Sequence, residues 1–327
     1  MNKLTLLLII PIVFSCSKST KYTDEYELIE NWLKIPDDYV FGNPTGVALK
    51  SNENLVVFHR GSRSWQVPMP KEKIIEDTFI EIDKVSGEII KSWGSDLFIM
   101  PHGLEIDKED NIWVTDVGLH QVIKFDSNGN ELMVLGVENT PGKDSLHFNL
   151  PTDLAVSENG SFYVSDGYGN SRIVKFSSSG EYLFEWGVFG KNKNEFNIPH
   201  GIDLDMEGNV YVADRENNKI QKYDSLGNFI AEWKNEIIGQ LYSVNVNNDY
   251  LFGIDYIGYE NLIPLGSDII KFDLDLNMKS KFGRSGNYNG PKARYHDIQI
   301  NNDNGDIYVG DILNNTIQKF RQKKTLN

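Results

Sequence analysis

Short runs of alternating apolar and polar residues follow one another along most of this chain, separated by turns rich in Asn, Gly, Asp and Ser. Alternation with a period of two is typical of half-buried β-strands, and these turn residues indicate tight connections between strands. The strands come in groups of four. The pattern therefore predicts an all-β fold made of repeated four-stranded units.

Three of these units align closely when Pro101, Pro151 and Pro199 are superposed. Each contains a short apolar strand, an Asn or Gly turn, a strand that ends in Asp, a strand that ends in Lys and an aromatic residue, and a fourth strand after a Gly turn. Three further units fit less closely. They begin with the segments Thr45–Leu49, Tyr242–Val246 and His296–Ile300, and the first two carry insertions, the first at residues 61–77.

Units of about 40 to 50 residues with four strands each are typical of a β-propeller. Six units fit, and no seventh is found for a seven-bladed alternative. The last unit has only three strands, but residues 25–32 resemble the fourth strand at residues 180–186. We therefore predict one six-bladed propeller over residues 25–321, closed by an N-terminal strand that removes an exposed edge.

One short motif recurs at the start of alternate units. It contains His102, His200 and His296, which fall on units two, four and six. First strands of propeller blades line the central channel, so equivalent positions on alternate blades form a triangle around the axis. Three imidazoles with an open fourth position match a catalytic zinc site, although iron, manganese or copper would suit the same ligands. The alternative for any single histidine is a hydrogen-bonded channel residue.

Further polar residues follow the second strands, near the same channel mouth. Arg60, Tyr168 and Arg215 are the candidates for substrate binding and acid–base chemistry, because Arg binds carboxylates bidentately and Tyr can act as a base. Asp297 can support the metal or bind a harder cation such as calcium. The alternatives are salt bridges and surface packing. His59, His120 and His147 lack the repeat position, and the Asp residues that end the second strands are expected to form turns or caps.

The N-terminal residues have the pattern of a targeting segment. Residues 1–15 contain Lys3 and an apolar run, as in a secretory signal. Cys16 is the single cysteine and follows this run in a lipobox-like context, which predicts lipidation; an ordinary signal peptide is the alternative. Residues 16–24 read as a tether. We therefore expect an exported protein that is held at a bacterial membrane through a lipid anchor only.

The composition limits the kinds of binding partner that the protein can have. The formal net charge is −15, with 40% hydrophobic and 24% charged residues. So acidic a surface repels phosphates, which argues against nucleic-acid binding. We expect a monomer.

Several segments resemble the peptidyl-α-hydroxyglycine α-amidating lyase family. Members of this family are six-bladed propellers of NHL-type repeats. The segments that carry the resemblance are residues 57–61, 101–104, 114–122, 151–153, 165–174, 213–217 and 296–298. One departure is clear. The family reads Met-Pro-His at the third histidine, where this chain has Arg294-Tyr295-His296.

The resemblance implies a peptidylamidoglycolate lyase-like enzyme that converts a C-terminal α-hydroxyglycine to a peptide amide and glyoxylate. It implies zinc on His102, His200 and His296, with Tyr168 as base and Arg60 and Arg215 at the substrate. It also implies a structural calcium on the carbonyls of Val47 and Leu104 and the carboxylate of Asp297. The substrate would be a peptide or small molecule that carries a carboxylate.

Two other functions stay open on the sequence. A non-enzymatic NHL propeller could bind a ligand or protein at the cell surface, since fold does not fix function. A related metal-dependent lyase or hydrolase could act on a different substrate, and Arg294 makes this alternative plausible.

Overall fold

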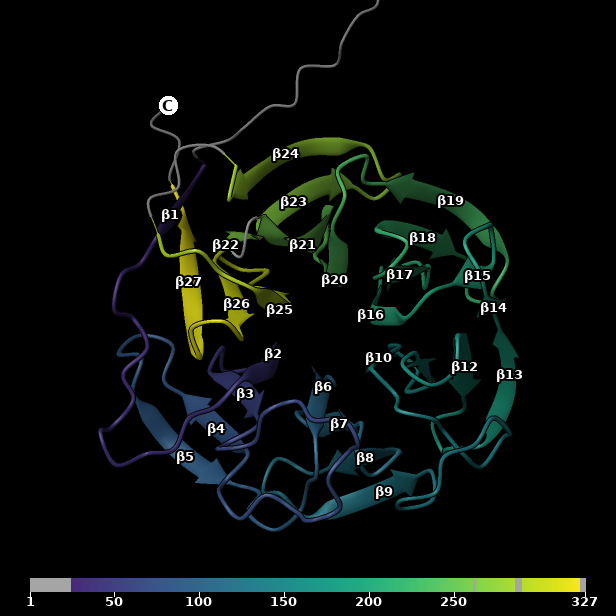
Figure 1. The fold of residues 1–327 in the computed structure, drawn as a ribbon, viewed down its shortest axis with the longest axis horizontal. Coiled ribbons are helices and arrows are strands. Elements are labelled where there is room, and N and C mark those ends of the chain that lie inside the picture. The colour runs from purple at the N-terminus through teal and green to yellow at the C-terminus, as the bar shows by residue number, and fades with distance from the viewer. Residues whose placement is uncertain (1–24, 261–262, 286–289, 324–327) are drawn as a thin grey trace, which may run out of the picture.

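The fold is a ring of six β-sheets around a central channel (Figure 1). The computed structural model describes residues 25–260, 263–285 and 290–323. The prediction of a six-bladed propeller is confirmed. Within these ranges there is no helix long and apolar enough to cross a membrane. The predicted signal at residues 1–15, Cys16 and the tether at residues 16–24 lie outside the described residues.

Each blade is an antiparallel sheet whose first strand faces the channel. Blades one, two and three comprise β2 (Pro44–Leu49), β3 (Leu55–His59), β4 (Phe79–Ile82), β5 (Ile89–Trp93); β6 (Pro101–Ile106), β7 (Ile112–Asp116), β8 (Gln121–Phe125), β9 (Glu131–Leu135); and β10 (Asp153–Val156), β11 (Phe162–Asp166), β12 (Arg172–Phe176), β13 (Tyr182–Trp186). Blades four, five and six comprise β16 (Pro199–Leu204), β17 (Val210–Asp214), β18 (Lys219–Tyr223), β19 (Phe229–Lys234); β20 (Gln240–Val246), β21 (Tyr250–Glu260), β23 (Asp268–Asp273), β24 (Met278–Gly283); and β25 (Tyr295–Ile300), β26 (Ile307–Asp311), β27 (Thr316–Gln322), β1 (Tyr26–Leu28). A short parallel pair, β14 (Val188–Phe189) and β15 (Glu195–Phe196), lies between blades three and four.

The hydrophobic core lies between the blades. Second strands such as β7 and β11 are buried along their whole length, whereas the outer strand β19 alternates between partly buried and exposed positions. One cluster joins Trp113 and Val122 of blade two to Phe162 and Val174 of blade three. The second strands are therefore central in the core, whereas the fourth strands form the half-exposed outer surface.

The predicted closure by an N-terminal strand is confirmed. β1 pairs antiparallel with β27, with Leu28 opposite Phe320, so β1 is the fourth strand of blade six and covers part of the edge that β27 would otherwise expose. The strand is shorter than the predicted segment at residues 25–32, because Asn31 adopts a left-handed conformation (φ 53°) and turns the chain. Trp32 then packs on Tyr308 at a ring-centroid distance of 5.3 Å.

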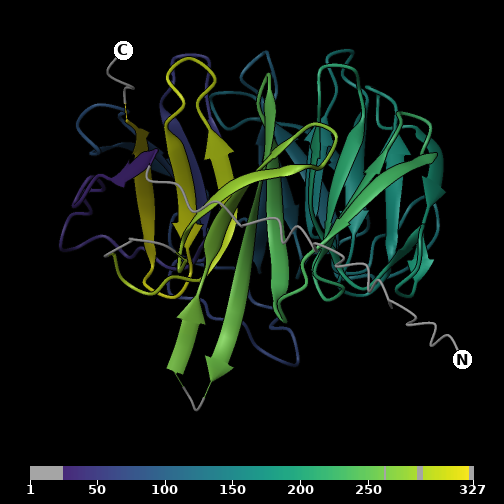
Figure 2. The same cartoon turned by 90° about the horizontal axis from the view of Figure 1, so that it is seen from above.

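The two predicted insertions lie at the end of the ring where the second strands finish. Residues 61–77 form a loop between β3 and β4. In blade five the insertion is a hairpin, in which β21 continues and pairs with β22 (Ile263–Gly266). This hairpin extends beyond one face of the ring (Figure 2).

Glycines let the inner strands approach one another closely. A Cβ on Gly201 would lie 2.6 Å from the Cα of Ser243, and one on Gly103 would lie 2.8 Å from the Cα of Asp153. Both clashes are with backbone atoms of the next blade.

We expect Gly201→Ala to lower the free energy of unfolding by about 1–3 kcal/mol, measured by denaturant titration.

The matched control is Gly253→Ala. A Cβ there would make ordinary contacts, the nearest at 3.5 Å to Ile220. Equal losses in the two variants would contradict the close-approach explanation.

Candidate metal centre

In blades two, four and six, a β-bulge at the start of the first strand directs one histidine side chain into the channel. The pairing with the second strand shifts between Pro199 and Gly201, and between Tyr295 and Asp297, so that His200 and His296 lie at the bulge. His102 lies within the corresponding shift of blade two. Bulges commonly aim side chains at functional sites.

The other three blades supply carbonyl oxygens to these histidines. The Nδ1 atoms of His102, His200 and His296 lie 2.6, 2.8 and 2.9 Å from the carbonyl oxygens of Thr152, Tyr242 and Thr45. A carbonyl only accepts, so each Nδ1 must carry the proton and donate it. Each Nε2 is then left with a free lone pair, which is the tautomer that binds a metal.

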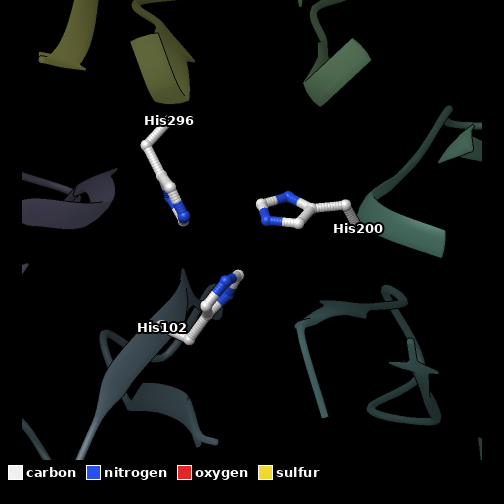
Figure 3. Close-up of side chains that lie close together, drawn as sticks. All are labelled: His102, His200 and His296. Atoms are coloured by element: carbon white, nitrogen blue, oxygen red, sulfur yellow. The ribbon is translucent and has the colours of Figure 1, made fainter. Parts of the chain in front are cut away.

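The three imidazoles converge, as the sequence predicted (Figure 3). Their ring centroids are 4.6 to 4.9 Å apart, and their ligand atoms all lie within 4.8 Å of one another. Burial lowers the pKa of all three histidines well below the usual value, and nearby positive charge adds to this effect. They are therefore neutral near pH 7 and suited to bind a metal ion.

Tyr168 lies directly beside this cluster. Its hydroxyl is 3.1 Å from Nε2 of His102, 3.1 Å from Nε2 of His200 and 3.1 Å from the Arg215 guanidinium, which donates to it. Burial raises the pKa of Tyr168, while the charges of Arg215 and Arg60 oppose this rise. The residues of this chain therefore keep the hydroxyl protonated unless further positive charge is added.

Arg60 is buried at the same mouth. Its Nε donates to the Pro101 carbonyl at 3.1 Å, and its Nη2 is buried without a partner in the described structure. Burial lowers the pKa of Arg60 to about 10. Trp65, from the insertion at residues 61–77, covers both Arg60 (5.5 Å) and the Tyr168 ring (4.9 Å). An unpaired buried donor is costly, so this one suits an anionic ligand.

Two site residues were missed by the sequence analysis. Tyr242 contacts the rings of His200 (5.0 Å) and His296 (5.7 Å), and its own ring lies under the Arg215 guanidinium (5.4 Å). It occupies the bulge position of blade five, so the repeat alignment could have found it. Trp65 lies in an insertion outside the repeat and gave no signal.

The remaining polar candidates behave structurally, as expected. The Asp116 carboxylate accepts the backbone N–H groups of Ile99, Met100 and Leu119, and thereby fixes the chain just before His102. His59 is buried in blade one, with Nε2 at 3.1 Å from the Tyr39 hydroxyl, away from the metal centre.

The residues implied for calcium gather around one small cavity deeper in the channel. It is lined by Val47, Leu104, Glu105, Asp153, Asp203 and Asp297, among others. Asp297 accepts hydrogen bonds from the Val47 N–H and the Ser243 hydroxyl, both at 2.8 Å. Burial raises the pKa of Asp297 to about 6. No Lys or Arg is among the described residues that line this cavity, and its oxygen donors suit a hard cation.

Fold and site together define a six-bladed propeller with three converging histidines that can hold a metal ion at one channel mouth. The NHL repeat family matches residues 148–176 and 196–223. A streptogramin B lyase structure superposes with a TM-score of 0.56 at 19% identity, covering 92% of this chain and 88% of that chain. At this identity, the structural likeness supports the fold alone.

Sequence relatives identify the family. The chain is 31% identical to peptidyl-alpha-hydroxyglycine alpha-amidating lyase 2 of Drosophila melanogaster, covering 88% of this chain and 72% of that protein. It is 36% identical to the peptidyl-glycine alpha-amidating monooxygenase of Mus musculus, covering 89% of this chain but only 32% of the mouse protein. The chain belongs to the peptidyl-alpha-hydroxyglycine alpha-amidating lyase family.

Proposed function

We propose that this protein is a zinc-dependent lyase that cleaves the N–Cα bond of α-hydroxyglycine-type carbinolamides to an amide and glyoxylate. Family membership supports a lyase of this kind. The observation that carries the proposal is the Tyr168 hydroxyl, which lies 3.1 Å from Nε2 of two of the three histidines. This proximity supports Tyr168 as a base beside a position where a metal would hold a substrate hydroxyl.

His102, His200 and His296 would hold the zinc, because their protonated Nδ1 atoms are bound to carbonyls and their Nε2 atoms face one another. When bound, the ion adds positive charge, which favours the ionised form of hydroxyl groups beside it. Three imidazoles leave a fourth position open, as in catalytic rather than structural zinc sites.

With the positive charge of the bound metal and of Arg215 beside it, Tyr168 would be ionised, and its phenolate would act as general base on the substrate hydroxyl. As the O–H proton passes to the Tyr168 oxygen, the C–O bond becomes the carbonyl of glyoxylate and the C–N bond breaks. The electron pair of that bond goes to the amide nitrogen. Tyr168 then returns the proton to this nitrogen, so no water or redox partner is consumed. Arg215 donates to the Tyr168 oxygen and stabilises it when ionised.

The substrate carboxylate would be held by Arg60. Its Nη2 has no partner in the described structure, and its Nε is fixed by the Pro101 carbonyl, so the guanidinium is preorganised for an anion. Trp65 covers this corner and would keep water from it.

Glyoxylate release tests the function directly. Purified protein loaded with zinc should release one glyoxylate per N-acyl-α-hydroxyglycine consumed, together with the free amide, measured by chromatography. Absence of glyoxylate would overturn the proposal. If elemental analysis also showed no transition metal, the results would favour a propeller that binds a ligand or protein without catalysis.

We also propose a structural calcium at Asp297 and the carbonyls of Val47 and Leu104. Buried carboxylates around one cavity repel each other, and a divalent ion would offset this repulsion. Calcium at about 100 times its Kd should stabilise the fold by roughly 2.7 kcal/mol. We expect the melting temperature to rise by several degrees, measured by scanning calorimetry after chelation and calcium return.

Magnesium is the matched control, because its smaller ion demands stricter octahedral geometry and gives up water reluctantly. In Asp297→Asn the calcium effect should shrink. A melting temperature that does not respond to calcium in the wild-type protein would contradict the site.

Export and lipid anchoring through Cys16 are proposed on the sequence pattern alone.

A further inference from the structure

A third arginine lies at the channel mouth in a place that the repeat does not require. The backbone N–H of Arg294 donates to Asp311 at 3.0 Å, as that of Met100 donates to Asp116 at 3.1 Å. The position two residues before His200 is also apolar, since it holds Ile198. The motif therefore folds without a cation two residues before the histidine. The guanidinium of Arg294 is not needed for the local fold, so we look for a function for it.

Arg294 is held one aromatic ring away from the histidines. Its Nε donates to the Tyr242 hydroxyl at 3.1 Å, and Nη2 also donates to it. The guanidinium carbon lies 5.3 Å from the Tyr242 ring centroid and 4.9 Å from that of Tyr256. Tyr242 in turn contacts both His200 and His296. The two rings therefore hold a half-buried cation one aromatic ring away from His200 and His296.

The charges at this mouth do not balance. Among the described residues, Arg215 is paired with Glu216 at 2.9 Å, but no carboxylate pairs with Arg60 or Arg294. The single carboxylate of the proposed substrate would offset one of these two charges. A partly desolvated guanidinium with free donors is a strong site for a second carboxylate.

We propose that Arg294 is a specificity-determining residue that selects substrates with a second carboxylate in the acyl part, beside the α-hydroxyglycine. An acidic residue that precedes the α-hydroxyglycine has this chemistry. Tyr242 and Tyr256 position the guanidinium and leave its other donors for the ligand. The inference rests on the proposed lyase function, because it assigns the substrate class of the same site.

The test compares two substrates that differ only in charge: N-acetyl-aspartyl-α-hydroxyglycine and N-acetyl-asparaginyl-α-hydroxyglycine. We expect wild-type kcat/KM to favour the aspartyl substrate on the order of 10- to 100-fold, because a hydrogen-bonded charge pair is lost in the other. In Arg294→Met this preference should disappear, through loss of activity on the aspartyl substrate alone. Arg294→Lys should retain part of it.

Arg321→Met is the matched control, because Arg321 is exposed on β27 of the same blade. It removes one positive charge and should leave the preference unchanged. Equal activity of the wild type on both substrates would overturn the inference while leaving the lyase function intact. Equal losses on both substrates in Arg294→Met would also overturn it, because Arg294 would then hold the carboxylate that both share.

Binding separates this inference from the lyase proposal. The unhydroxylated peptides N-acetyl-Asp-Gly and N-acetyl-Asn-Gly cannot be cleaved in this way, and calorimetry of the zinc-loaded protein measures their affinities. Preference for the aspartyl peptide, lost in Arg294→Met, would support the anion site even if no substrate were cleaved. No preference in the wild type would contradict it whether or not the protein is a lyase.

Discussion

Replacing His296 by alanine should leave the protein without stoichiometric zinc and lower kcat/KM for glyoxylate release on the order of a thousandfold or more. The reason is geometric. Three Nε2 atoms converge because three bulges and three carbonyls fix the rings, and two imidazoles alone cannot complete this ligand set. Elemental analysis should give about one zinc per chain for the wild type and much less for the variant. Chelation of the wild type should have the same effect, and returned zinc should reverse it.

His147→Asn is the control for this experiment. His147 lies in a loop, where Nδ1 contacts Asp144 at 2.8 Å, and it takes no part in the metal centre. Metal content and activity should therefore stay at wild-type values. Scanning calorimetry would show whether His296→Ala still folds. Full activity of a folded, metal-free variant would exclude a catalytic role for the metal.

The histidine triangle could be predicted from sequence because the repeat converts position along the chain into position around the ring. His102, His200 and His296 share one repeat position, and alternate blades of a six-bladed ring are related by about a third of a turn. The same alignment shows why the strand-end aspartates are structural. Asp116 and Asp311 bind backbone N–H groups just before a histidine and do not face the channel chemistry.

Other features depend on contacts that no repeat encodes. The carbonyls of Thr45, Thr152 and Tyr242 set the imidazole tautomers, and every residue except proline offers the same donor and acceptor on its backbone. Trp65 reaches Tyr168 only because an irregular loop folds back over the mouth. The sequence predicts an insertion in blade five, but not that it forms a hairpin, because this depends on the register of β21 with β22. The contacts of Arg294 with Tyr242 and Tyr256 likewise needed the structure.

Replacing Tyr168 by phenylalanine should lower kcat about 100- to 10,000-fold, the range expected for loss of a general base. The substitution removes only the oxygen that lies 3.1 Å from Nε2 of His102 and His200. The ring can still pack against Trp65, and the Nδ1 hydrogen bonds of the histidines are untouched. Zinc content should therefore match the wild type. KM should change little, because Arg60 remains to hold the substrate carboxylate.

This separation of effects distinguishes a base from a structural residue. Steady-state kinetics of glyoxylate release, with elemental analysis of the same samples, would measure both quantities. Tyr182→Phe removes a hydroxyl from β13, where the side chain is 40% exposed, and should leave kcat and metal content unchanged. A loss of zinc in Tyr168→Phe would assign the hydroxyl to metal binding. A kcat within about threefold of the wild type would require another base, and the described structure places no other ionisable hydroxyl within hydrogen-bonding distance of two of the histidine Nε2 atoms.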